Sequence, residues 1–161
     1  MRSVPVELTR DCYSARRAQC SFCGLPAERN TRTAKATEVV STIAGLHQAF
    51  GVRHFIFADP AIHGRKHRAL VARLAEYFQG NAEKPIFFFE VRADATRQTL
   101  EALARLDNVV VQVGVESFSH QILTLMKKGV SPIENVQFLK WCRELGVFPY
   151  YNILWGHPGE D

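Results

Sequence analysis

The sequence is poor in cysteine, methionine and tryptophan, and it has no long hydrophobic run. Its 161 residues include four cysteines, two methionines and two tryptophans. No apolar stretch approaches the roughly 20 residues that a membrane-spanning helix needs, and the first residues, MRSVPVELTR, lack the apolar segment of a signal peptide. We therefore expect a cytoplasmic protein that has no membrane partner.

The chain also lacks a strong excess of charge of one sign. The net charge is +4 and the isoelectric point is about 9.0, but the lysines and arginines are scattered along the chain rather than gathered in blocks. A surface that binds nucleic acid typically combines clustered basic side chains with aromatic ones, and the sequence has no such stripe. We therefore expect no nucleic-acid partner.

Apolar residues follow patterns typical of strands and of helices in alternation along the chain. We expect strands over residues 3–8, 54–58, 85–91, 109–115 and 147–155. Helical spacing predicts helices over residues 39–50, 70–78, 100–106, 122–126 and 132–145. The last helix is preceded by Ser131 and contains Pro132 and Glu134 in its first turn, which is typical of a capped helix start.

The alternation of strands and helices predicts a parallel α/β sheet. The segment PIFFFEV (85–91) is apolar without alternation, as expected for a strand that is buried on both faces. No G-x-G-x-x-G motif follows the first strand, so a dinucleotide-binding sheet lacks support, whereas a barrel or partial barrel fits the order. The chain ends in WGHPGED after its fifth strand, and we expect a domain that is truncated at that point.

Three of the four cysteines lie in one short segment, CYSARRAQCSFCG, directly after the first strand. Cys12 and Cys20 enclose seven residues, and Cys20 and Cys23 enclose two. Cytoplasmic thiols stay reduced, so this cluster indicates a metal site or catalysis rather than disulfides. Three closely spaced thiolates can bind zinc or an iron–sulfur cluster.

We do not expect the fourth cysteine to complete a four-ligand zinc site. Cys142 lies on the apolar face of the helix predicted over residues 132–145, with Phe138 and Trp141, and we place it in the core. No histidine lies between residues 12 and 24. Three ligands without a fourth leave one position open, which is typical of a reactive centre rather than a structural site.

These features together resemble the radical S-adenosylmethionine (SAM) superfamily: a first strand, three cysteines, Phe22 before the last cysteine and Gly24 after it. The first interval of the motif, C-x7-C-x2-C, is longer than in the commonest spacing of that superfamily. The resemblance implies that Cys12, Cys20 and Cys23 bind three irons of a [4Fe–4S] cluster and that SAM binds the fourth. It also implies a parallel (β/α) partial TIM-type barrel.

The resemblance further implies SAM contacts in the segments FADP, FFFEVRAD, VGVESFSHQILTLMKKG and NILWGHPGE. Glu90 and Glu116, at the ends of the third and fourth strands, would hydrogen-bond the SAM amino group and ribose, and Lys128 would pair with its carboxylate. Ligands of parallel α/β folds gather at such strand ends. The remaining expected contacts are Asp59 with the amino group, Phe22 and Leu154 with the adenine, and Gly156 as a point of close backbone approach.

Structural alternatives exist for several of these residues. Glu90 could form an ion pair with Arg92, and Asp59 could cap the next helix. Arg16 and Arg17 lie inside the cysteine segment and could meet substrate or an electron donor, although most loop arginines are simply solvated.

Nearly the whole chain resembles one branch of the superfamily, through the segments CSFCGL, FEVRAD, VQVGVESFSHQILTLMKKGV, NVQFLKWCRELGV and NILWGHPGED. This branch comprises cobalamin-dependent radical SAM proteins that mature ribosomally synthesised peptides (RiPPs), many of them C-methyltransferases. Their radical SAM core follows a cobalamin-binding domain. We therefore expect residues 1–161 to be a radical SAM core domain, incomplete at its carboxyl end, with the cobalamin domain upstream and outside this chain.

The resemblance implies that an electron from the cluster cleaves SAM to methionine and a 5′-deoxyadenosyl radical, which takes a hydrogen atom from a peptide carbon. Methylcobalamin would then supply a methyl group, so no side chain is expected as a catalytic acid, base or nucleophile. The expected partners are a peptide substrate and a reductant such as flavodoxin or ferredoxin. Alternatives are another radical SAM activity, such as methylthiolation, or a non-enzymatic zinc or iron–sulfur binding module.

Overall fold

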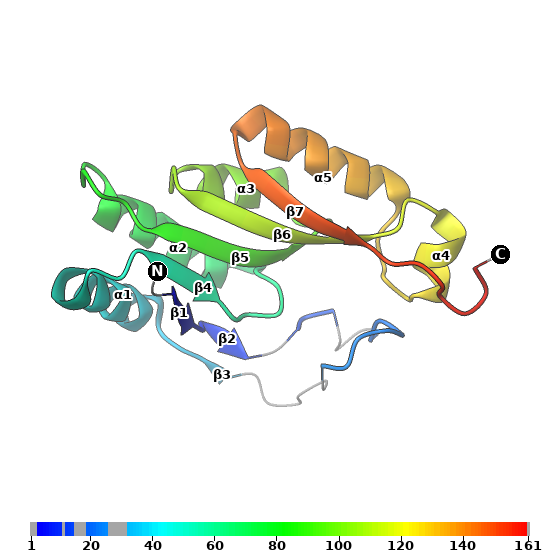
Figure 1. The fold of residues 1–161 in the computed structure, drawn as a ribbon, viewed down its shortest axis with the longest axis horizontal. Coiled ribbons are helices and arrows are strands. Elements are labelled where there is room, and N and C mark those ends of the chain that lie inside the picture. Colours follow the sequence, from blue (N-terminus) through cyan, green and yellow to red (C-terminus); the bar gives the residue numbers. More distant parts are fainter. Residues whose placement is uncertain (1–2, 11, 15–18, 26–31, 161) are drawn as a thin grey trace.

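The computed structural model describes residues 3–10, 12–14, 19–25 and 32–160. Its main sheet has five parallel strands (Figure 1). From one edge to the other these are β1 (Ser3–Val6), β4 (His54–Phe57), β5 (Ile86–Arg92), β6 (Val109–Glu116) and β7 (Phe148–Ile153). The sequence prediction of a parallel sheet is therefore confirmed.

The spatial order of these strands is their order along the chain. The helices between them are α1 (Ala36–Phe50), α2 (Gly64–Phe78), α3 (Arg97–Ala104), α4 (His120–Leu125) and α5 (Pro132–Leu145). Helices α1, α2, α3 and α5 pack side by side in that order, whereas α4 lies beyond the carboxyl ends of the strands (Figure 1). Among the described residues, no helix is long and apolar enough to cross a membrane. A strand order without a reversal winds in one direction, as in a partial barrel, and differs from a doubly wound sheet.

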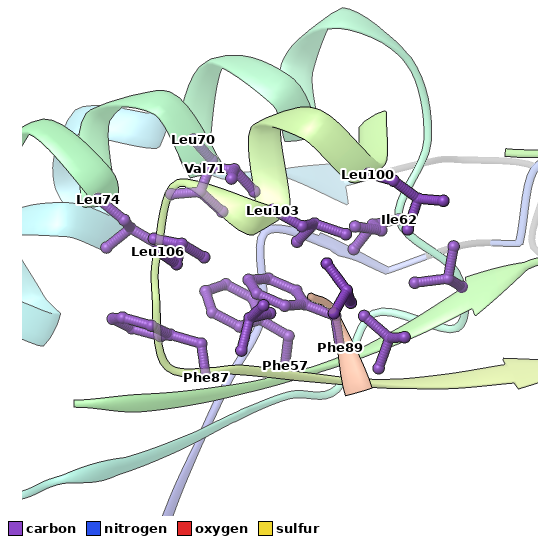
Figure 2. Packing of buried hydrophobic residues seen from close by; sticks show 14 of the residues in the cluster. Phe57, Ile62, Leu70, Val71, Leu74, Phe87, Phe89, Leu100, Leu103 and Leu106 are labelled. Atoms are coloured by element: carbon purple, nitrogen blue, oxygen red, sulfur yellow. The ribbon is translucent and has the colours of Figure 1, made fainter. Parts of the chain in front are cut away.

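The core lies between the sheet and these helices. Alternate residues of β6, from Val109 to Val115, are buried, and the residues between them are only half-buried. Phe57 of β4 stacks on Phe89 of β5 with 4.4 Å between ring centroids, and leucines of α2 and α3 cover both rings (Figure 2). The structure thus buries one face of the three central strands β4, β5 and β6, so the expectation that 85–91 is buried on both faces is wrong for the described chain.

The capping signals in the sequence act as predicted. Ser131 and Glu134 form a reciprocal capping box at the start of α5, and Gly146 ends that helix in the left-handed conformation with φ of 69°. Helix α2 begins at Gly64, well before the predicted start at residue 70. Its first turn, GRKH, is mostly polar and basic, so apolar spacing alone did not reveal it.

Two very short strands lie beside the cysteine segment and were not predicted. The first strand ends at Val6 rather than at residue 8, and β2 (Thr9–Arg10) then pairs antiparallel with β3 (Arg32–Thr33). This pairing brings the two ends of the segment between residues 10 and 32 together at the base of a loop, the cysteine loop. The described parts of the loop, residues 12–14 and 19–25, lie toward the carboxyl edge of the sheet (Figure 1).

Candidate active site at the carboxyl edge of the sheet

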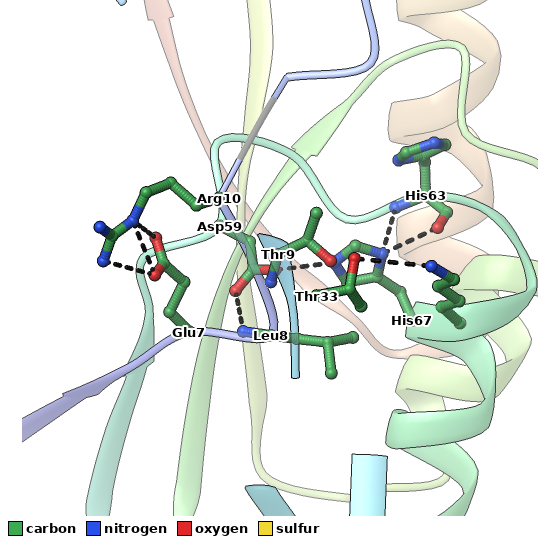
Figure 3. Close-up of polar contacts among 9 residues, drawn as sticks. Glu7, Leu8, Thr9, Arg10, Thr33, Asp59, His63 and His67 are labelled. Atoms are coloured by element: carbon green, nitrogen blue, oxygen red, sulfur yellow. Dashed lines mark hydrogen bonds and ion pairs between the residues drawn. The ribbon is translucent and has the colours of Figure 1, made fainter. Parts of the chain in front are cut away.

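Asp59, directly after β4, anchors the chain where it enters the cysteine loop. Its carboxylate accepts hydrogen bonds from the backbone amides of Leu8 at 3.0 Å and Thr9 at 2.7 Å. The same carboxylate lies 2.9 Å from Nε2 of His67 on α2, and both side chains are buried (Figure 3). Asp59 therefore ties β2 and the base of the loop to the body of the fold.

These contacts bear on the structural alternative for Asp59, a cap on the next helix. The residue does not cap the next helix, because α2 has His63 at its N-cap position. Both carboxylate oxygens are occupied by the loop base and His67, so the observed role of Asp59 is structural. The contact with the SAM amino group stays a prediction.

Tyr13 connects the cysteine loop to the end of β5. Its hydroxyl donates a hydrogen bond of 2.6 Å to Asp94, and Nε of Arg92 donates to the same carboxylate at 3.2 Å. The Tyr13 ring also stacks on His63, with 3.9 Å between centroids. Burial, followed by the hydrogen bond to Asp94, raises the pKa of Tyr13 well above its ordinary value, so the hydroxyl stays protonated and remains a donor.

The second half of the cysteine motif is a tight turn that rests on the end of α4. The amide of Cys23 donates to the carbonyl of Cys20 at 3.1 Å. Ser21, inside the turn, donates from its amide to the carbonyl of Met126 at 2.9 Å and lies 3.1 Å from the carbonyl of Leu125 through Oγ. Backbone contacts thus fix this turn against the segment that leads to Lys128.

The three loop cysteines are half-buried and free, whereas Cys142 is fully buried in the core. Burial raises the pKa of the Cys142 thiol to about 12, so it is a poor metal ligand, and its predicted place in the core is confirmed. Among the described residues, no three Cys, His, Asp or Glu side chains surround a single metal-ion position. A cluster that takes one thiolate per iron does not need that convergence.

Glu116 and Lys128, both singled out by the sequence, form a largely buried ion pair. Nζ of Lys128 lies 2.9 Å from Oε1 of Glu116, and the two side chains are 7% and 14% exposed. Glu116 adopts a left-handed backbone with φ of 62°, beside an irregularity between β6 and β7. Such strain in a residue other than glycine costs about 1–3 kcal/mol and is concentrated at functional sites.

Gly114 makes room for this ion pair. A Cβ atom at this position would lie 2.5 Å from Nζ of Lys128 and 3.0 Å from Oε1 of Glu116. Any larger residue would therefore displace the lysine. Lys128 also faces the cysteine loop, because its Nζ lies 5.4 Å from the ring centroid of Phe22.

Arg92 joins the two halves of the site. It is 7% exposed, and its Nη2 donates a hydrogen bond of 2.6 Å to the backbone carbonyl of Lys128. Its ion-pair partner is Asp94 rather than Glu90, so the alternative of a Glu90–Arg92 pair is wrong. Glu90 lies on the face of the sheet away from the helices, beside Gln112; its side chain is exposed, yet desolvation raises its pKa.

The last expected SAM contacts lie after β7, near the same edge. Leu154 is half-buried, and its amide donates to the carbonyl of Glu116 at 2.9 Å. Gly156 is exposed and has φ of 69°, a conformation that favours glycine. Arg16 and Arg17 lie outside the described residues.

Sequence reasoning missed four residues that build this site: Tyr13, His67, Arg92 and Asp94. The adjacency of Tyr13 to Cys12, and the charged VRAD segment at a strand end, were available signals. Their partners could not be read from the sequence, because Tyr13 and Asp94 are 81 residues apart.

Structural comparison finds similar folds in two SAM radical enzymes. The radical SAM methyltransferase TsrM from Kitasatospora setae, with tryptophan and a SAM analogue bound, matches 98% of this chain with a TM-score of 0.83 and 17% identity. The cobalamin-dependent SAM radical enzyme OxsB, with aqua-cobalamin and SAM bound, matches 94% with a TM-score of 0.75 and 21% identity. These matches cover only 31% and 24% of the two proteins, and at such identities they show the fold alone.

The sequence itself decides the family. No curated protein sequence matches the chain significantly. A family model described as the radical SAM superfamily matches residues 6–161. That match runs from the end of β1 through the cysteine loop to the turn after β7, and so includes every element of the site described above. The chain belongs to the radical SAM superfamily.

Proposed function

We propose that this chain is the catalytic core of a cobalamin-dependent radical SAM enzyme that methylates a carbon of a ribosomally synthesised peptide. One observation carries the proposal: the cysteine loop is held directly against the Glu116–Lys128 pair, with Lys128 5.4 Å from the Phe22 ring. A metal-binding motif and a charge pair suited to a zwitterion thus share one edge of the sheet.

The proposed cluster ligands are Cys12, Cys20 and Cys23. They fit a [4Fe–4S] cluster because they are half-buried, free and held by a loop that is fixed at its base, by Tyr13 and by the turn at Ser21. When bound, the cluster and SAM supply one-electron cleavage of the SAM sulfonium bond, which generates the 5′-deoxyadenosyl radical. The protein holds these groups in place and excludes water.

The proposed site for the amino-acid end of SAM is the Glu116–Lys128 pair. SAM carries an ammonium and a carboxylate, and the buried pair offers one group of each opposite sign at 2.9 Å from each other. Lys128 would bind the carboxylate, and Glu116 and Glu90 would serve the amino group and ribose. Asp59, whose carboxylate holds the base of the cysteine loop, would contact the amino group only from that position. Charge-assisted hydrogen bonds of this kind are about twice as strong as neutral ones.

The adenine is assigned to Phe22 and Leu154, with Gly156 beside it. Phe22 exposes part of its ring, and Leu154 is half-buried next to Glu116. An aromatic face and an aliphatic side chain are suited to the two faces of a purine.

Methyl transfer and the peptide substrate rest on the sequence segments and on the nature of the structural neighbours. TsrM is a radical SAM methyltransferase, and OxsB binds cobalamin. We assign cobalamin binding to a part of the full-length protein outside residues 1–161. The electron would come from a flavodoxin or ferredoxin in the cytoplasm, where thiols stay reduced.

The test of the cluster is anaerobic reconstitution followed by iron and sulfide analysis and Mössbauer spectroscopy. We expect one [4Fe–4S] cluster per chain. Replacing any of Cys12, Cys20 or Cys23 by serine should abolish it, and the matched control Cys142→Ala should leave it intact. Stoichiometric zinc without sulfide would contradict the proposal and favour a structural binding module.

The test of the reaction uses the full-length protein with SAM, methylcobalamin, a reductant and peptides encoded beside its gene. We expect 5′-deoxyadenosine together with a peptide that is heavier by one methyl group, located by tandem mass spectrometry. A product that gains a methylthio group would replace methylation with the alternative radical SAM activity. Formation of 5′-deoxyadenosine with no modified peptide would reject the substrate class.

A further inference from the structure

Two buried cations lie against the two aromatic residues of the cysteine loop. The guanidinium carbon of Arg92 is 5.7 Å from the ring centroid of Tyr13, and Nζ of Lys128 is 5.4 Å from that of Phe22. Tyr13 follows Cys12, and Phe22 lies between Cys20 and Cys23. Each proposed cluster ligand is therefore one or two residues from an aromatic ring that faces a cation.

The two cations differ in how their charge is balanced. Lys128 has its own largely buried carboxylate, Glu116, at 2.9 Å. Arg92 shares Asp94 with the hydroxyl of Tyr13, and the Asp94 side chain is 28% exposed. The positive charge of Arg92 is therefore less fully compensated within the protein than that of Lys128.

Arg92 also keeps its charge and its position. Burial disfavours its charged form, but the Asp94 carboxylate, which also accepts its hydrogen bond, favours that form, and the pKa of Arg92 is raised overall. The guanidinium thus stays positively charged over the ring of Tyr13, the residue after Cys12. It is also fixed by its hydrogen bonds to Asp94 and to the carbonyl of Lys128.

We propose that Arg92 is a positioning residue for the cysteine loop and a fixed cation that makes the metal cluster easier to reduce. The inference deepens the proposed function and rests on it, since it requires the cluster on Cys12, Cys20 and Cys23. It concerns neither SAM binding nor the peptide substrate.

The physical reason is the sign of the charge that reduction adds. Three thiolates outweigh the positive charge of an oxidised [4Fe–4S] core, so the site is already negative before an external reductant adds one electron. A nearby fixed cation stabilises the more negative state more strongly, and partial burial keeps that interaction from being screened. The cation therefore raises the reduction potential of the cluster.

The test is a redox titration of the reconstituted protein with dithionite, in the absence of SAM, followed by electron paramagnetic resonance. We expect Arg92→Gln to make one-electron reduction at least tenfold less favourable, a downward shift of about 59 mV or more. Arg92→Lys, which keeps the charge but loses the fork that binds Asp94 and Lys128, should shift the potential less. An unchanged potential in a cluster-loaded Arg92→Gln protein would overturn the inference.

A second variant separates electrostatics from damage to the loop. Asp94→Asn removes the negative charge beside Arg92 but keeps a hydrogen-bond partner for Tyr13, so the potential should rise. Opposite shifts in Arg92→Gln and Asp94→Asn support the inference, and shifts of the same sign overturn it. If Arg92→Gln does not load a cluster, Asp94→Asn decides alone, and a potential that does not rise overturns the inference.

The two proposals fail in different ways. Wild-type protein without a cluster would reject the proposed function. If the wild type binds a normal cluster and the reduction potential is the same in both variants as in the wild type, only the role of Arg92 is rejected.

Discussion

The helix-covered face of the sheet and its carboxyl edge are built from the same strands but differ in polarity: the covered face is packed with apolar side chains, and the edge carries buried charged ones. On the covered face, Phe57 and Phe89 stack among leucines of α2 and α3. At the edge, the buried ionisable side chains Asp59 and Arg92 lie at or just after strand ends, and Lys128 pairs with Glu116 at the end of β6. Buried charges cost desolvation free energy that their pairing only partly returns.

The difference indicates that, along β5 and β6, residues that stabilise the core are followed by residues that form the candidate site. In β5, Phe89 belongs to the core, and Arg92, three residues later, belongs to the site. In β6, Val115 is fully buried, and Glu116 directly after it has a strained left-handed backbone. We infer that the edge is maintained for binding, because apolar residues there would stabilise the fold better.

The largest expected effect is a loss of stability when the packing of the helix-covered face is disrupted. Phe89→Ala should lower the free energy of unfolding by about 3–5 kcal/mol, because it removes a fully buried ring and leaves a cavity against Phe57. The measurement is urea denaturation followed by circular dichroism.

The matched control for this prediction is the preceding residue. Phe88 points to the opposite face of the sheet and is only half-buried, so Phe88→Ala should cost clearly less. Equal losses for the two variants would mean that the uncovered face is as important for stability as the core.

The next largest effect is expected at the carboxyl edge, when the Glu116–Lys128 ion pair is replaced by neutral side chains. The double variant Glu116→Gln/Lys128→Met removes the ion pair but leaves no buried charge without a partner. Its stability should equal or exceed that of the wild type, because buried pairs are often replaced at no cost by neutral groups. SAM binding should weaken about 10- to 150-fold, the value of one charge-assisted hydrogen bond of roughly 1.5–3 kcal/mol.

Isothermal titration calorimetry on the cluster-loaded protein measures this SAM affinity. The single variant Lys128→Met is the control, and it should be less stable than the double variant because Glu116 then stays charged without its lysine. Unchanged SAM affinity in the folded double variant would reject the assignment of the pair.

The fold was predictable because its signals are local. The long strands carry continuous apolar runs such as PIFFFEV, and α5 carries its capping box and terminal glycine in consecutive residues. The two-residue strands β2 and β3 have no periodic pattern, so only their pairing across the loop reveals them. The uncovered face of β5 was also misjudged, because apolar composition does not tell which face a neighbour covers.

The candidate site was predictable in its residue types and less so in its contacts. The cysteine spacing and the strand-end positions of Glu116 and Lys128 were visible in the sequence, and the structure brings Glu116 and Lys128 together. The role of Asp59 was not visible, because it depends on backbone amides about 50 residues earlier. The bridge from Tyr13 through Asp94 and Arg92 to Lys128 likewise exists only after folding.

The smallest expected effect concerns Glu90, and it tests whether this exposed carboxylate near the edge lowers the stability of the fold. Desolvation raises the pKa of Glu90 in the folded protein, so the folded state holds its proton more tightly than the unfolded chain does. The carboxyl group therefore contributes no penalty below the unfolded pKa of about 4.3 and becomes destabilising as pH rises through the folded pKa. Glu90→Gln, which cannot ionise, should be more stable than the wild type at pH 7 and equally stable below pH ~4. Because the side chain is exposed, the gain should be less than about 1 kcal/mol. Thermal denaturation of both proteins across this pH range measures the difference. A gain that does not vary with pH, or a loss at pH 7, would show that Glu90 supports the fold and that the division between covered face and edge is not complete.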